Sequence, residues 1–182
     1  DRILHDLKAI FVHVPKTGGN SVTTALNSVP RQSTGTIYPE LFKHSKAFDV
    51  RQAVGEEIWS QYFSFAFVRN PWDLQVSSFH HIRRERPHLL GEHQEFEDFL
   101  RWKLDPERPY QYHIDTSMQL QSDYLVNLQG EMLVDFIGRY ENLTEDFASV
   151  CTRLGLHGIA LPHKRQATDR GSDYRHYYSD QT

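Results

Sequence analysis

The sequence predicts an α/β domain of three layers, with helices on both faces of a central parallel sheet. Short apolar runs rich in β-branched and aromatic residues occur at 8–14, 63–68 and 134–140 of the 182-residue chain, and such runs are typical of strands buried on both faces. Helical patterns separate these runs, which favours parallel pairing. We expect one domain over 1–182, because a chain of this length has room for a single full core.

The helices between these strands are predicted from the spacing of apolar residues and from the residues that begin and end each helix. Pro30 and Gly55 follow the first two helices and end them. Asn70 is a suitable cap for the third helix, and Pro71 then occupies the first helical position. Asn142 caps the last helix. In chain order, the predicted helices span 21–29, 47–54, 70–84, 95–104 and 142–154.

Charge and composition describe an ordinary globular protein without bulk affinity for polyanions. Asp and Glu number 24 against 20 Lys and Arg, a net charge of −4, which argues against binding of nucleic acid or anionic lipid. No apolar run approaches the ~18 residues of a membrane-spanning helix, so we expect no membrane contact by this segment. The single cysteine, Cys151, is predicted to be a buried thiol. It suits a bacterial cytoplasm, and the lumenal domain of a membrane-anchored enzyme is the alternative.

The first predicted strand leads into a loop with the residue types of a phosphate cradle. Gly18 and Gly19 allow the backbone to approach a ligand closely, and Lys16 supplies a positive charge. Side-chain donors at the start of the next helix are offered by Thr17, Asn20 and Ser21.

The order of residues in this loop differs from that of the usual nucleoside-triphosphate loop, in which Lys follows the glycines. Here Lys16 precedes them, and no apolar strand ends in an Asp that could hold magnesium. The sequence therefore disfavours metal-dependent phosphoryl transfer. Nor does any set of His, Cys, Asp or Glu have the spacing of a zinc site.

A second candidate anion site follows the second predicted strand. Arg69 can make two parallel hydrogen bonds to a phosphate, and Ser77, two turns into the next helix, could turn its hydroxyl toward the same group. Arg69 could instead form a structural ion pair. Together with the loop, this site predicts a ligand with two separated anionic groups, such as an adenosine with a 5′ diester-like group and a ribose phosphate.

These motifs resemble those of the sulfotransferases that use 3′-phosphoadenosine 5′-phosphosulfate (PAPS), most closely the carbohydrate-type branch with the PKTGG signature. Residues 11–21 (FVHVPKTGGNS) look like that family's 5′-phosphosulfate loop, with Asn20 where Thr is commoner. Residues 65–73 (FAFVRNPWD), with Ser77, look like its 3′-phosphate motif. Residues 136–143 and 174–178 also resemble family segments, and a final helix common in relatives is expected to be missing after Thr182.

The resemblance implies a P-loop-like fold and the transfer of a sulfuryl group from PAPS to a hydroxyl on a glycan or a small molecule, without a metal. Lys16 is then the electrostatic catalyst and, with residues 17–21, a cofactor ligand; Arg69 and Ser77 hold the 3′-phosphate. An ATP-dependent small-molecule kinase is one alternative. A non-catalytic nucleotide- or glycan-binding module is another.

The general base should be a histidine or a carboxylate. His44 lies between the two cofactor motifs, where its position resembles that of the family's base, and we favour it over a solvated loop histidine. His80 and His81, on the helix after the second motif, and Glu141, after the third strand, are alternatives. His13 alternates with apolar neighbours and is expected to be packed in the core.

Basic residues elsewhere have two interpretations. Residues 162–182 are expected to form a surface lid or tail, in which Lys164, Arg165 and Arg170 either close over the cofactor or are solvated. The basic run 83–86 either meets an acidic glycan or is an exposed face.

Overall fold

The computed structural model describes residues 3–31, 36–162, 173–180 and 182. Their contacts divide the chain into two units, each with its own core. We call them the sheet unit, which comprises Asp1–Val68 and Leu120–Lys164, and the helical unit, which comprises Arg69–Gln119 and Arg165–Thr182. In the part of the chain described, no helix is both long enough and apolar enough to cross a membrane.

Parallel strands form the centre of the sheet unit, as predicted. The strands are β1 (Ile3–Leu4), β2 (Ala9–Val12), β3 (Phe63–Val68) and β4 (Phe136–Arg139), and they lie in this order across the sheet. β2, β3 and β4 are parallel, whereas the short β1 pairs antiparallel with β2. The carboxyl ends of β2 and β3 are neighbours, since Val12 pairs with Ala66. The loop after β2 therefore begins beside the end of β3.

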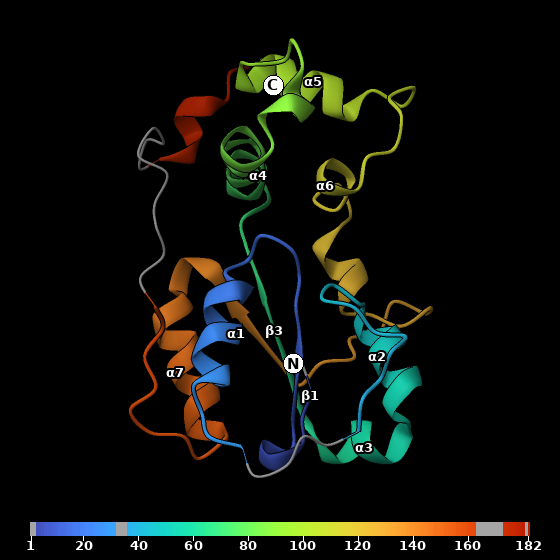
Figure 1. Cartoon of the computed structure of the whole chain (residues 1–182), viewed down its shortest axis with the longest axis vertical. Coiled ribbons are helices and arrows are strands. Elements are labelled where there is room, and N and C mark those ends of the chain that lie inside the picture. Colours follow the sequence, from blue (N-terminus) through green and yellow to red (C-terminus); the bar gives the residue numbers. More distant parts are fainter. Residues whose placement is uncertain (1–2, 32–35, 163–172, 181) are drawn as a thin grey trace. The chain divides into compact units, whose positions relative to one another are not determined.

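Helices cover both faces of this sheet, which gives the three predicted layers (Figure 1). Alternate side chains of β3 point to opposite faces, so that Phe65 and Phe67 pack with α1 and α7 whereas Ala66 packs with α2 and α3. Cys151 is buried on α7 at 6% exposure, as predicted. Burial raises the pKa of its thiol. The helices are α1 (Gly19–Asn27), α2 (Ala47–Val54), α3 (Glu56–Gln61) and α7 (Leu143–Arg153), with 3₁₀ turns η1 (His5–Leu7), η3 (Gln121–Tyr124) and η4 (Tyr140–Asn142).

The helical unit begins where β3 ends and is built around one long helix. Its elements are α4 (Pro71–Glu85), η2 (Pro87–Leu90), α5 (Phe96–Leu104), α6 (Tyr112–Asp115) and η5 (Tyr174–Tyr177). The apolar stripe of α4, with Phe79 and Ile82, packs against Phe96 and Phe99 of α5. η2, α5 and α6 thus supply residues to this core, with Leu90 and Ile114 among them.

The Tyr-rich end of the chain packs on α4 instead of lying in solvent as a tail. Tyr174, Tyr177 and Tyr178 contact the core of the helical unit, and the hydroxyl of Tyr178 donates to the carbonyl oxygen of Trp72 at 2.7 Å. Burial raises the pKa of Tyr178 above its ordinary value. The rest of the predicted lid, with Lys164, Arg165 and Arg170, lies outside the described residues.

Candidate functional site

The loop between β2 and α1 adopts the sharp backbone that a phosphate cradle requires. Lys16 has a φ of 64° and Gly18 a φ of 83°, both in the left-handed region. A left-handed backbone is unusual for a residue with a side chain, and such positions cluster at ligand sites. Gly18 is the N-cap of α1, so the helix begins directly after the loop with its N–H groups turned toward it.

Neighbouring side chains leave no room for a Cβ at either glycine of the loop. A Cβ on Gly18 would lie 2.9 Å from Leu143 and 3.1 Å from Tyr140, and one on Gly19 would lie 2.0 Å from Nε2 of His13. The loop is therefore pressed against α7 on one side and against the His13 ring on the other. Position 18 favours glycine because its backbone is left-handed. Position 19 favours glycine because a side chain there would overlap the His13 ring.

The candidate base His44 lies beside this loop. Its ring packs edge-on against the His13 ring, with centroids 4.7 Å apart, and its Nδ1 lies 2.9 Å from the carbonyl oxygen of His13. A carbonyl oxygen only accepts, so Nδ1 carries the proton and the lone pair of the neutral ring is on Nε2. The half-buried His44 thus has the tautomer that a base acting through Nε2 needs.

His13 connects His44 to the loop. It is 5% exposed and stacks on Phe11 of β2, with ring centroids 5.3 Å apart. Its ring therefore contacts the core strand, Gly19 and His44 together. The sequence predicts its burial correctly, but nothing in the sequence indicates that it lies between the loop and His44.

Thr17 differs from the expectation that its hydroxyl is offered to a ligand. Its side chain is fully buried, and Oγ1 donates to the carbonyl oxygen of Val14 at 2.8 Å. The hydroxyl closes the turn of the loop, because a buried hydroxyl requires an internal partner. Ser21 is 3% exposed, whereas Asn20 is exposed on the first turn of α1.

The helical unit holds the second set of predicted residues, with Arg69 just before α4 and Ser77 on it. Arg69 is 6% exposed, and its Nε donates to a carboxylate oxygen of Asp73 at 2.6 Å. Ser77 follows Asp73 by four residues and therefore lies on the same face of the helix. The ion pair that was one interpretation of Arg69 is present.

Asn70 caps the start of α4. Its side-chain oxygen accepts from the backbone N–H groups of Trp72 and Asp73 at 2.9 and 3.3 Å, as the predicted cap requires. Its side-chain nitrogen donates to the hydroxyl of Tyr174 at 3.2 Å. Asn70 therefore joins the N-terminus of α4 to η5.

The other candidate bases lie in different surroundings. His80 is 5% exposed in the helical unit, with its Nε2 2.8 Å from the hydroxyl of Tyr177, and His81 is half-buried on the same helix. Glu141 is exposed in η4. Within the described residues, no group of three or more His, Cys, Asp and Glu is placed to hold a metal ion.

Known proteins share this sequence pattern across nearly the whole chain. A model of the sulfotransferase family matches residues 2–181, a range that includes the loop, His44, Arg69 and Ser77. An uncharacterized protein of Archaeoglobus fulgidus (strain ATCC 49558 / DSM 4304 / JCM 9628 / NBRC 100126 / VC-16) is 34% identical over 112 residues, which are 60% of this chain and 82% of that protein.

Proposed function

The chain belongs to the sulfotransferase family, and from this membership we propose that it transfers a sulfuryl group from PAPS to a hydroxyl of a glycan or a small molecule, with His44 as the general base and without a metal. The observation that carries the proposal is the loop of residues 16–21, which is pressed against His13 with His44 packed beside it. PAPS would supply the activated sulfuryl group, whose bond to the 5′-phosphate breaks as the acceptor oxygen bonds to sulfur.

Lys16 and the backbone N–H groups at the start of α1 are suited to the negative charge that develops on a leaving phosphate. Lys16 contributes a positive charge, and Gly18 and Gly19 let the loop pack against α7 and the His13 ring. Because the Thr17 hydroxyl donates to Val14, Thr17 would contribute through its backbone N–H. Asn20 and Ser21 complete the set on the first turn of the helix.

His44 would take the proton of the acceptor hydroxyl on Nε2. The hydrogen bond from Nδ1 to the His13 carbonyl holds the ring in one orientation and favours the cationic ring once the proton has arrived. His13 itself would act as a positioning residue, since its ring contacts both His44 and the loop at Gly19.

Arg69 and Ser77 would hold the 3′-phosphate. A phosphate accepts parallel hydrogen bonds from a guanidinium, and the Asp73 carboxylate fixes the orientation of that guanidinium. Their role is binding and orientation, because the 3′-phosphate does not react.

Ligand selectivity tests the proposal most directly. We expect 3′-phosphoadenosine 5′-phosphate (PAP) to raise the melting temperature, and 5′-AMP and ATP, with or without magnesium, to raise it far less. Ligand at a hundred times its dissociation constant adds about 2.7 kcal/mol, or roughly 5–10 °C for a chain of this size. A larger shift with magnesium and ATP would favour the kinase alternative and contradict the proposal.

Three variants separate the proposed roles. Lys16→Ala should abolish turnover but keep part of the affinity for PAP, whereas Arg69→Ala should mainly raise the dissociation constant. His44→Ala should lower turnover with PAP affinity nearly intact, and His157→Ala, at an exposed histidine, is its matched control. A fully active His44→Ala would move the base to His80, His81 or Glu141. If no acceptor is turned over by a chain that binds PAP, the non-catalytic alternative is favoured.

A further inference from the structure

A lysine is buried in the helical unit. Lys103, on α5, is 1% exposed and is among the largest fully buried side chains described. Lysine is almost never fully buried unless its ammonium group is well paired, because the loss of hydration is costly. The surroundings of this residue therefore need an explanation beyond packing.

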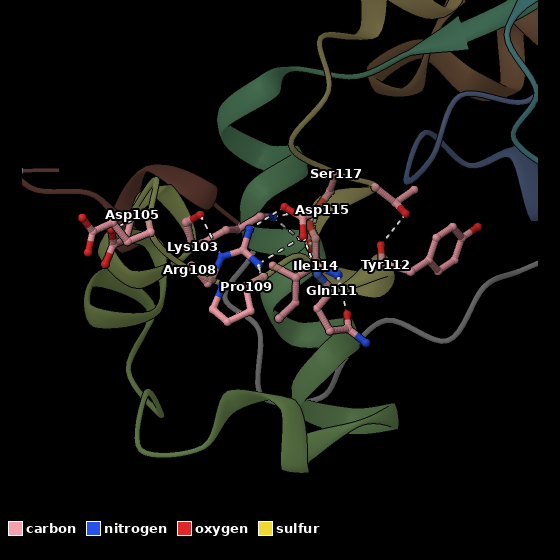
Figure 2. Close-up of polar contacts among 12 residues, drawn as sticks. Lys103, Asp105, Arg108, Pro109, Gln111, Tyr112, Ile114, Asp115 and Ser117 are labelled. Atoms are coloured by element: carbon pink, nitrogen blue, oxygen red, sulfur yellow. Dashed lines mark hydrogen bonds and ion pairs between the residues drawn. The ribbon is translucent and has the colours of Figure 1, made fainter.

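Hydrogen bonds join the Lys103 ammonium to α4 and to the turn after α6. Figure 2 shows Lys103 with Ser117 of that turn and with the Arg108–Asp115 pair. Nζ lies 2.7 Å from Oε1 of Gln75, 2.6 Å from Oγ of Ser117 and 3.4 Å from Oγ of Ser78. An ammonium has three N–H groups and these are three acceptors. Gln75 also donates to the Ser117 carbonyl oxygen at 2.9 Å, so the same helix and turn are joined twice.

The charged groups that act on Lys103 come from the segment between α5 and Ser117. Arg108 makes a two-point ion pair with Asp115, at 2.5 and 3.1 Å, and its side chain is 4% exposed. Nε of Arg108 also donates to the carbonyl oxygen of Lys103 at 3.2 Å. The facing side chains on α4, Gln75 and Ser78, are neutral. The positive charges of Lys103 and Arg108 thus lie near the single negative charge of Asp115.

The helix that Lys103 holds is the one that carries a proposed cofactor ligand. Gln75 and Ser78 lie on either side of Ser77 in the sequence of α4, and the three are within one turn. A shift or rotation of this turn would change the direction of the Ser77 hydroxyl. Small displacements of a positioning group are enough to alter ligand binding by large factors.

We propose that Lys103 is a positioning residue for the nucleotide: its ammonium group holds α4 against the turn that carries Ser117 and thereby orients Ser77 toward the 3′-phosphate. This inference rests on the proposed function, because it assigns the consequence of the contact to Ser77. It adds a residue that touches neither cofactor nor acceptor.

Proton loss from Lys103 should weaken this contact. The neutral amine has two N–H groups and a lone pair, so it can no longer donate to all three acceptors. Burial, and to a lesser extent Arg108, lower the pKa of Lys103 to about 7, and Asp115 opposes them. The ammonium therefore titrates in the range in which the protein can be studied.

The test is the affinity for PAP, measured by calorimetry from pH 6.5 to 9, for the wild type, Lys103→Met and Arg101→Met. Arg101 is the matched control, a basic residue of α5 whose side chain is 60% exposed and pairs with Glu97. We expect Lys103→Met to bind PAP about tenfold more weakly at pH 6.5, the size typical of an indirect coupling, and Arg101→Met to bind as the wild type does. The affinity of the wild type and of Arg101→Met for PAP should fall as the pH rises through 7. Lys103→Met should not show the part of this fall that comes from proton loss at Lys103.

Ser117→Ala serves if Lys103→Met does not fold, because it removes the nearest acceptor and should give a smaller loss with the same pH component. If Lys103→Met and Ser117→Ala bind PAP with the same affinity and the same pH profile as the wild type, the role of Lys103 is overturned while the proposed function stands. Absence of PAP binding by the folded wild type would instead overturn the proposed function, and this inference with it.

Discussion

At the scale of single residues, the His13 ring restricts position 19 to glycine. The His13 ring occupies the space that a Cβ at position 19 would need, with only 2.0 Å between that position and Nε2. The ring is in turn held by Phe11 and His44. A side chain at position 19 must therefore displace the histidine pair, the loop or both.

We predict that Gly19→Ala destabilises the protein and disturbs the loop. Overpacking of this kind costs about 1–3 kcal/mol, although alanine favours the helix itself. Urea denaturation measures the loss, and the chemical shifts of the His13 and His44 rings should change with it. Asn20→Ala, at the next and exposed position of α1, is the control. Equal stability of the two variants would mean that the loop adapts to the extra methyl group.

At the scale of elements, the start of α4 depends on one side chain. Asn70 accepts from two backbone N–H groups that have no partner within the helix, and it also donates to Tyr174. The corresponding residue before α7, Asn142, makes no side-chain bond to the helix N–H groups. The same residue type thus has different roles at the two helix starts.

Asn70→Ala should therefore cost about 1 kcal/mol, the usual value for loss of a cap, and Asn142→Ala should cost less. Thermal denaturation followed by circular dichroism compares the two variants. Tyr174→Phe removes the hydroxyl that accepts from Asn70 and leaves the cap intact, so its stability separates the cap from the contact to η5. A larger loss in Asn142→Ala than in Asn70→Ala would contradict this assignment.

At the scale of the whole molecule, Lys103 makes the free energy of unfolding depend on pH. Its pKa in the folded protein is about 7, against an ordinary value of 10.5. Between these values the unfolded chain binds a proton that the folded protein does not, so stability rises with pH from about 7 upward. Below pH 7 both states are protonated and this contribution is constant.

We predict that the rise is absent from Lys103→Met and present in Arg101→Met. Urea denaturation from pH 6 to 9 provides the comparison, and the difference between each variant and the wild type removes the effect of other groups. Cys151 and Tyr178, whose pKa values are raised by burial, act in the opposite direction at higher pH, because the unfolded chain releases their protons first. Parallel curves for all three proteins would contradict the titration of Lys103 near neutrality.

Local patterns were sufficient to predict the longer elements of both units. β3 and α2 span the predicted residues, and α1, α4, α5 and α7 differ from prediction by two residues or fewer at most ends, since capping residues and apolar spacing act within a few positions. The edge strand β1 and the short helices α3 and α6 were not predicted. These elements are too short for the spacing of apolar residues to reveal a strand or helix period, and contacts with distant residues stabilise them.

By itself, the sequence determined the α/β class, the parallel strands, the loop and its glycines, and the family. These depend on local residue types and on spacing that repeats along the chain. Only the tertiary structure decided that His13 lies between Gly19 and His44, that the Thr17 hydroxyl closes the loop, and that Lys103 is buried against α4. Each of these depends on contacts between separate segments, and the burial and partners of a side chain are decided by such contacts, which residue type and spacing do not specify.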